Sequence, residues 1–360
     1  MKRLHRAMGA VGFSLLLVVA GCSSGGETAV STTPVSSSAN PSPSSTKASP
    51  TPSPTPEPTP TPEPAPPPPP PTDPLIGGDL LQGPVIAVKI DNTGAGFPQY
   101  GVSDADLVFV EQVEGGLTRL MAVYHSNLPT EVGAVRSVRT TDAELLPVFG
   151  TPALVFSGGA GVPLAALANT PVVAVSQDDG GPGFWRSDAA RAPYNLHSNL
   201  QSVVGTVNGI SQPNNIGLVF AASDPRVDAA PTATSMSVQY EAARVEFGQE
   251  NGRYRLIRGG EGESDASGAP VLTDNVVFMT VGFEPDGEFD SVGSPSFISH
   301  TVGNGTFTLF RDGHAISGSW SRAAPDQPFQ FLDASGQPVP FKPGKSWVAL
   351  VPPTASIGAS

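Results

Sequence analysis

A long proline-rich stretch near the N-terminus is the feature that most limits where this chain can fold. Residues 23–74 consist almost entirely of Ser, Thr, Pro, Gly and Ala, with Thr-Pro repeated over residues 51–62 and unbroken proline over 66–71. Such a composition cannot bury a hydrophobic core. Proline-rich chain favours extended polyproline II at ~3.1 Å per residue. Residues 22–74 are therefore predicted to form a disordered stalk, either semi-rigid or without a defined reach, and the fold is expected to begin near Leu75.

The segment before the stalk is typical of a bacterial lipoprotein signal peptide. Residues 1–21 have a basic start, an apolar run over residues 11–20 and the end Val-Ala-Gly before Cys22. The run is shorter than the ~20 residues that a transmembrane helix needs. Cys22 is the only cysteine, so it can carry a lipid but form no disulfide. We expect cleavage before Cys22 and anchoring, by palmitate or similar acyl chains, to the extracytoplasmic face of the cell membrane.

The charge of the chain limits its partners. Without the signal peptide, 16 Lys and Arg oppose 32 Asp and Glu, a net charge of −16. A chain this acidic is not expected to bind nucleic acid, whose phosphates attract basic surfaces. Anionic lipid would also repel it, so the membrane contact is expected through the lipid on Cys22 alone.

The pattern of apolar runs predicts an α+β fold. Residues 85–90 form a buried strand candidate, and residues 107–113 and 119–125 flank a short turn as in a β-hairpin. A helix is expected from Thr140 to Phe149, with Thr141 and Glu144 as its capping box. Further alternation of strands and short helices predicts a mixed α/β module over residues 75–225.

The second half of the chain has a different character. From about residue 236, apolar runs alternate with turn signals such as Asn251-Gly252, which favours a type I′ hairpin. This pattern predicts a mostly antiparallel β module over residues 235–352. A boundary between residues 223 and 234 fits their Pro, Asp and Ala content.

The few cations of the first module are the main functional signal. Between residues 75 and 224 the basic side chains are Lys89, Arg119, Arg136, Arg139, Arg186 and Arg191. Arg136 and Arg139 directly precede the predicted helix, whose N-terminus disfavours cations by up to ~1 kcal/mol each. Negative charge should therefore compensate them. It can come from a bound anion, such as phosphate, pyrophosphate or carboxylate, or from internal pairing. The internal candidates are Glu111, Glu114, Asp142 and Glu144.

Other polar residues are expected near the same place. Glu111 and Glu114 end one strand of the predicted hairpin and Arg119 begins the next, so the two carboxylates can either pair with arginine or act as general acid and base. Asp91 and Asn92 follow the first strand, where open α/β sheets bind ligands, although an Asx turn is the simpler role.

The sequence indicates acid/base catalysis by a histidine, or a metal site, less strongly than it indicates the arginine cluster. His197, beside Asn195, is the best acid/base candidate among the histidines, with a structural role as the alternative. No two histidines have the spacing of metal ligands, so neither a metal site nor a cofactor is expected.

Several motifs together resemble the YerB-like bacterial lipoproteins, whose two modules form domain of unknown function 3048. They are VIAVKIDN at residues 85–92, GVSDAD at 101–106, VEGGLTR at 113–119, VGAVRSVR at 132–139, GSWSR at 318–322 and PGKSWV at 343–348. Where that family tends to have Pro-His-Asn-Leu-Tyr, this chain has Pro-Tyr-Asn-Leu-His at residues 193–197. The exchange weakens a mechanism that needs an imidazole at one fixed position. The resemblance implies an envelope location but no activity.

We therefore expect a lipid-anchored, non-enzymatic module that binds an anionic or sugar-containing cell-wall ligand. The expected ligand-binding residues are Asp91, Asn92, Glu114, Arg119, Arg136, Arg139 and Asn195. One alternative is a hydrolase or transferase acting on envelope glycopolymers, with Glu111, Glu114 or His197 as the acid or base. Another is a structural role or binding of an envelope protein, which would leave Arg136 and Arg139 fully paired within the fold.

Overall fold

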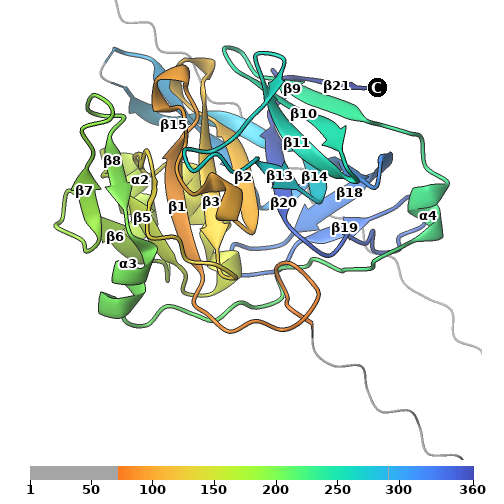
Figure 1. Cartoon of the computed structure of the whole chain (residues 1–360), viewed down its shortest axis with the longest axis horizontal. Coiled ribbons are helices and arrows are strands. Elements are labelled where there is room, and N and C mark those ends of the chain that lie inside the picture. The colour runs from red at the N-terminus through yellow and green to blue at the C-terminus, as the bar shows by residue number, and fades with distance from the viewer. Residues whose placement is uncertain (1–71, 291) are drawn as a thin grey trace, which may run out of the picture. The chain divides into compact units, whose positions relative to one another are not determined.

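Strands from both halves of the chain form one sheet of ten strands, in the order β19-β18-β17-β14-β20-β2-β3-β1-β5-β6. The computed structural model describes residues 72–290 and 292–360, so the signal peptide, Cys22 and the stalk up to residue 71 lie outside the described residues (Figure 1). The strands are β1 (Ile86–Asp91), β2 (Leu107–Gln112), β3 (Thr118–Tyr124), β5 (Ala153–Phe156), β6 (Val173–Ser176), β14 (Asn275–Thr280), β17 (Gly303–Arg311), β18 (His314–Arg322), β19 (Gln330–Leu332) and β20 (Ser346–Val351).

Three smaller sheets and a few short helices complete the described part. A second sheet contains β9 (Ser235–Gln239), β10 (Arg244–Glu250), β11 (Arg253–Arg258), β12 (Glu261–Gly262), β13 (Leu272–Thr273) and β21 (Ser356–Ala359). The others contain β15 (Gly282–Phe289) with β16 (Pro295–His300), and β4 (Val132–Gly133) with β7 (Phe184–Arg186) and β8 (Leu196–Ser198). The helices are α1 (Thr140–Leu145), α2 (Gly161–Ala168), α3 (Leu200–Thr206) and α4 (Pro225–Asp228), with 3-10 turns η1 (Gly94–Gly96), η2 (Val102–Asp104), η3 (Glu114–Gly116) and η4 (Leu146–Phe149). Strand is thus the main secondary structure of the described residues.

One strand near the C-terminus joins the two halves. β20 pairs in parallel with β14 on one side and with β2 on the other. Every residue of β1, β2, β3 and β20 is buried, because separate apolar clusters cover the two faces of the sheet. Strands covered on both faces have continuous apolar runs rather than alternating ones. This explains the uninterrupted apolar character of residues 85–88.

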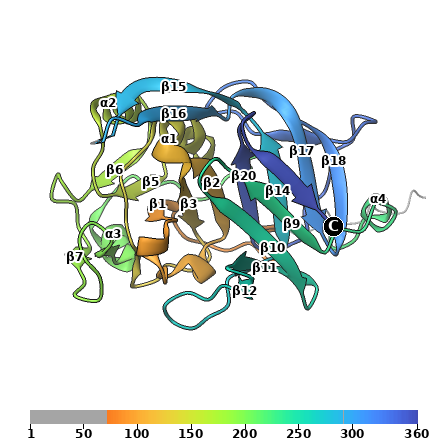
Figure 2. The same cartoon turned by 90° about the horizontal axis from the view of Figure 1, so that it is seen from above.

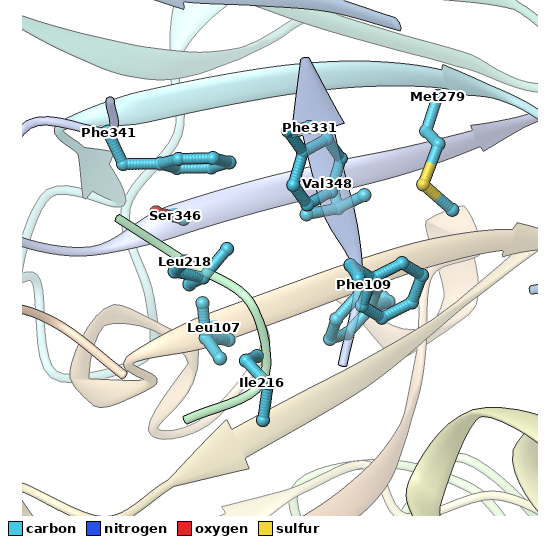
Figure 3. A pocket seen from close by; sticks show the side chains of 10 residues that line it. Leu107, Phe109, Ile216, Leu218, Met279, Phe331, Phe341, Ser346 and Val348 are labelled. Atoms are coloured by element: carbon cyan, nitrogen blue, oxygen red, sulfur yellow. The ribbon is translucent and has the colours of Figure 1, made fainter. Parts of the chain in front are cut away.

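The segment between the halves lies across one face of the sheet. Ile216 and Leu218 point from it toward Phe109 of β2, while Phe331 and Phe341 close the opposite side (Figure 3). Packing leaves a cavity of only about 10 Å³ there. The segment between the halves therefore forms part of the hydrophobic core and does not act as a flexible hinge.

Two expectations about local structure have different outcomes. The hairpin is confirmed, because β2 and β3 are antiparallel with Glu111 opposite Arg119. The capping box is wrong. Helix α1 starts at Thr140 and is capped by Asp142, whose Oδ2 accepts from the Arg139 backbone N–H at 2.8 Å. Glu144 Oε1 instead accepts from the backbone N–H groups of Thr301 and Val302, the second at 2.6 Å.

The chain enters the fold through a buried hydrogen bond between Asp73 and His125. Asp73 is completely buried and its Oδ2 lies 2.9 Å from His125 Nε2, just after β3. The other ring nitrogen, Nδ1, lies 2.9 Å from the Gly83 carbonyl oxygen. Asp73 also accepts from the backbone N–H groups of Leu75 and Ile76. The end of the predicted stalk is thereby fixed to the sheet.

The β15–β16 hairpin forms an arm that reaches α1 and α2 (Figure 2). Its contacts are mainly polar. Thr140 Oγ1 donates to Asp286 Oδ2 at 2.7 Å, and the Val162 N–H at the start of α2 donates to Glu288 Oε1 at 2.7 Å. His300 Nδ1 lies 3.1 Å from Glu144 Oε2 on α1. The arm is therefore held by hydrogen bonds and charge more than by apolar packing.

Replacing Gly217 with alanine should destabilise the fold strongly. Gly217 has φ +100°, and an added Cβ would lie 1.8 Å from the Phe329 carbonyl oxygen. Strain and overpacking together should lower the free energy of unfolding by about 2–4 kcal/mol in urea denaturation. Gly205→Ala is the matched control, because its Cβ would meet no atom within 4 Å in helix α3. It should gain up to ~1 kcal/mol. Equal stability of both variants would contradict the close packing of Gly217 against Phe329.

The His300 contact should make stability depend on pH. Burial lowers the pKa of His300, but hydrogen bonds to Glu144 and Glu284 outweigh burial, and the pKa lies above its ordinary value of 6.5. This contribution is fully present below pH 6.5 and is lost as pH rises through the raised pKa of the folded state. Thermal unfolding between about pH 6 and 8.5 should show a smaller decline for His300→Gln than for the parent. His314→Gln, whose ring faces the Ala230 carbonyl, should decline like the parent. If the unfolding temperature declined equally with pH in all three proteins, a contribution of His300 to the pH dependence would be excluded.

Candidate functional site

The carboxyl end of β1 brings most of the expected residues together. Lys89 and Asp91 lie on the same face of β1, since side chains alternate along a strand. Asp91 is opposite Arg119 of β3, and Arg119 is opposite Glu111 of β2. Arg136 and Arg139 reach the same end from the segment before α1. We call these residues, with Glu114 and Asp142, the charge cluster.

The inner part of the charge cluster is built around a buried lysine. The Lys89 side chain is completely buried, lies 2.7 Å from Asp142 Oδ1 and also pairs with Glu111. Burial lowers the pKa of Lys89 to about 8, although the carboxylate of Asp142 opposes the shift. Two carboxylates around a single buried cation favour its charged form. This inner part is structural, because neither Glu111 nor Asp142 is more than 3% exposed at its side chain.

The outer part of the charge cluster contains the three arginines. Arg136 Nε lies 3.0 Å and Arg119 NH2 3.6 Å from the same atom, Asp91 Oδ2. Arg139 NH2 lies 2.8 Å from Glu114 Oε2. The exposed fractions of these arginine side chains are 8% for Arg119, 19% for Arg136 and 14% for Arg139. Internal pairing thus accounts for much of the compensating charge.

The charges are unevenly divided between the two parts. The whole cluster is neutral, with four cations and four carboxylates, but the outer part has three guanidiniums against Asp91 and Glu114. Burial lowers the pKa of Arg119 to about 10 even though Asp91 raises it. The buried Nε atoms of Arg119 and Arg139 have no hydrogen-bond acceptor among the described residues. The outer part therefore has donor capacity and positive charge in excess.

A small pocket adjoins the outer part. The Arg136 guanidinium lies over the Tyr194 ring at 5.1 Å and donates from NH1 to the Pro193 carbonyl at 3.3 Å. Tyr194, Tyr100 and His197 line a cavity of about 50 Å³. The cavity wall approaches Asp91 so closely that a Cβ on Gly96 would lie 2.6 Å from Asp91 Oδ1. Two residues that line the pocket thus contact the outer part of the charge cluster: Gly96 lies against Asp91, and Tyr194 lies under Arg136.

The remaining predicted residues mostly hold loops in place. Asn92 donates to Thr118 Oγ1 at 2.8 Å and accepts from Arg258 at 3.2 Å. Asn195 donates to the Ser187 carbonyl at 2.9 Å and accepts from Arg186 at 2.9 Å. Neither side chain lines the small pocket.

His197 has a defined environment of its own. Its Nδ1 lies 2.6 Å from Glu131 Oε1, and its ring centroid lies 4.4 Å from that of Tyr100. The side chain is only 2% exposed. His197 therefore belongs to the wall of the pocket and is separate from the carboxylates Glu111 and Glu114.

Sequence reasoning missed several members of this site. Lys89 carried a signal, because a lysine within an apolar strand must find a carboxylate when it is buried. Tyr100, Tyr194 and Glu131 carried none, since only the fold brings them beside His197. In the described part of the chain, no group of three or more His, Cys, Asp or Glu side chains is placed to hold a metal. No helix there is long and apolar enough to cross a bilayer.

Comparison with known proteins places this fold in a family. The model of the protein of unknown function DUF3048, N-terminal domain, matches residues 75–211, and that of its C-terminal domain matches residues 233–348. The chain belongs to the DUF3048 family. A Bacillus subtilis relative named "Putative lipoprotein YerB" is 25% identical over 284 residues, which cover 74% of this chain and 81% of the relative.

A solved DUF3048 relative shares the fold. The crystal structure of YerB from Bacillus subtilis superposes with a TM-score of 0.67 at 24% identity, covering 80% of this chain and 99% of that one. The two DUF3048 matches correspond to the two sequence segments that meet at β20 and β2. The predicted resemblance is thus confirmed, and it supports a lipoprotein of the cell envelope.

Removing the inner cation should be costly for stability. Lys89→Met leaves Glu111 and Asp142 buried without a counter-charge, so the free energy of unfolding should fall by about 3–5 kcal/mol in urea denaturation. Adding Glu111→Gln and Asp142→Asn should recover part of the loss. Arg244→Ala, which breaks an exposed pair with Glu246, should cost less than ~1 kcal/mol. A Lys89→Met protein as stable as the parent would show that the inner part is not needed.

Proposed function

We propose that this protein is a lipid-anchored envelope module that binds an anionic, sugar-containing cell-wall ligand at the outer part of the charge cluster. The observation that carries the proposal is the excess of guanidinium over carboxylate beside a pocket. Arg119, Arg136 and Arg139 share Asp91 and Glu114, and Arg136 also lies over the ring of Tyr194, which lines the pocket. Guanidinium groups bind carboxylate and phosphate through paired hydrogen bonds.

The burial of these arginines makes them better anion-binding groups than exposed arginines of the surface. An ion pair that is largely shielded from water is screened less by salt than an exposed one. An anion that replaces or supplements Asp91 would therefore gain more here than at a surface arginine. The pocket beside Arg136 supplies the apolar and aromatic surface that sugars and their substituents contact.

The location of the protein narrows the class of ligand. A lipid on Cys22 and a proline-rich stalk would hold the folded part outside the membrane, among the polymers of the wall. Those polymers carry phosphate or carboxylate groups on sugars. The net charge of −16 predicted for the mature chain would repel them in general, so attraction must come from a local positive site.

Binding fits the carboxylates better than catalysis does. Glu111 is buried against Lys89, and Glu114 is held 2.8 Å from Arg139. A carboxylate held by a cation is stabilised in its charged form and serves poorly as a general acid. The cluster therefore supports a binding role ahead of hydrolysis or transfer.

Ligand-induced stabilisation tests the proposal. The thermal unfolding midpoint of the full-length protein in detergent should rise by roughly 5 °C with saturating teichoic acid or peptidoglycan fragments, because a ligand at 100 times its Kd adds about 2.7 kcal/mol. Arg136→Ala and Arg139→Ala should each lose most of this shift. Arg244→Ala should keep it, since the Arg244 side chain is exposed at the start of strand β10.

Two outcomes would contradict binding at the cluster. One is a shift of equal size in the parent and in both cluster variants. The other is the absence of a shift with every wall fragment and with pyrophosphate. The second outcome would favour the structural or partner-binding role, for which internally paired arginines suffice.

A further inference from the structure

The pocket beside Arg136 has features that select one chemical group. It combines small apolar side chains from the loop after β1 and from the loop after β7 with three polar rings. Its main lining residues are Ala95, Phe97, Tyr100, Ala134, Tyr194 and His197. Such a pocket, mainly apolar with a few polar groups, is the usual design of a specific small-molecule site.

The polar groups of the pocket are available for a ligand. Neither the Tyr100 nor the Tyr194 hydroxyl has a hydrogen-bond partner among the residues that the structure describes. His197 Nδ1 lies 2.6 Å from the Glu131 carboxylate. A carboxylate can only accept, so Nδ1 is the donor of this pair, and Nε2 is the ring nitrogen left to face a ligand. Two tyrosines and a histidine thus line the pocket with polar groups that can bond to a ligand.

The size of the pocket limits what can enter it. A cavity of about 50 Å³ is available. This space is small, though larger than the roughly 10–15 Å³ that a single water occupies. The enclosed space therefore favours a group smaller than a whole sugar ring. A planar acetamido group, with one methyl, one carbonyl and one N–H, has the right size.

The chemistry of the acetamido group matches the lining. Its methyl would contact Ala95, Ala134 and Phe97. Its carbonyl would accept from a tyrosine hydroxyl, and its N–H would donate to His197 Nε2. The sugar ring would then remain outside, where Arg136 lies against Tyr194.

We propose that the pocket binds the N-acetyl group of an amino sugar whose negative charge pairs with Arg136. This inference rests on the proposed function and specifies its ligand as an N-acetylated amino sugar that carries a carboxylate. The fit of the acetyl group in the pocket selects N-acetylated sugars, and the charge of Arg136 selects anionic ones. Neither feature alone would hold a monosaccharide tightly.

Three probes separate the two features. N-acetylmuramic acid has both the acetyl group and a carboxylate, N-acetylglucosamine has only the acetyl group, and glucuronic acid has only a carboxylate. Saturation-transfer NMR with the full-length protein in detergent should show the strongest transfer at the acetyl methyl of N-acetylmuramic acid. We expect N-acetylmuramic acid to bind at least tenfold more tightly than either of the other sugars.

Three variants locate the bound group. Ala190→Leu, at an exposed position that lines the pocket, should abolish the methyl signal by filling the cavity. Ala165→Leu, at an exposed position of helix α2, is the matched control and should leave the signal intact. Tyr194→Phe keeps the ring under Arg136 but removes the hydroxyl, and should weaken binding several-fold.

The outcomes distinguish this inference from the proposed function. Equal binding of N-acetylmuramic and glucuronic acids, both lost in Arg136→Ala, would overturn the acetyl site and leave the anion site in place. A methyl signal unchanged by Ala190→Leu would also overturn it. If none of the three sugars binds while teichoic acid fragments still stabilise the protein, the acetyl site fails and the proposed function stands.

Discussion

The fold depends on one strand that arrives late in the chain. β20 lies between β14 and β2 and pairs in parallel with both, so the ten-stranded sheet is continuous only when it is in place. Parallel pairing between segments so distant in sequence requires large loops to close before any contact is gained. The two family segments are therefore not independent in structure. The charge cluster, on the strands next to β2, is built on a sheet that is completed from the other half.

Buried charge is the second constraint, and it explains the arrangement of the site. Lys89 is tolerated inside the sheet because two carboxylates pair with it, and among the described residues these carboxylates form no salt bridge to another cation. The arginines farther out must then share Asp91 and Glu114. A surplus of guanidinium at the edge of the cluster follows from the need to neutralise the lysine at its centre. The same distribution of buried charges thus stabilises the fold and leaves the outer arginines able to bind an anion.

The sequence predicted the local features better than the long-range ones. The β2–β3 hairpin and the strand around Lys89 followed from apolar runs and a glycine turn, which are short-range signals. The helix cap at Thr141 failed because the helix begins one residue earlier, with Arg139 as the N-cap and Asp142 accepting from its N–H, while Glu144 accepts from Val302. The ring cluster at His197 was beyond reach, since Tyr100 and Tyr194 come beside it only through the fold.

The attachment point of the stalk has a mechanical consequence. Asp73 is fixed to His125 beyond the last residue of β3, Tyr124, which pairs with the first residue of β1, whereas Arg119 pairs with the last. Stalk and charge cluster are thus at opposite ends of these strands, roughly 20 Å apart at ~3.3 Å per residue. If the proposed lipid anchor and the proposed wall ligand both hold the protein, tension between them would pull β1 and β3 in shear, along their length. In that geometry the hydrogen bonds between them resist together and are not opened one at a time.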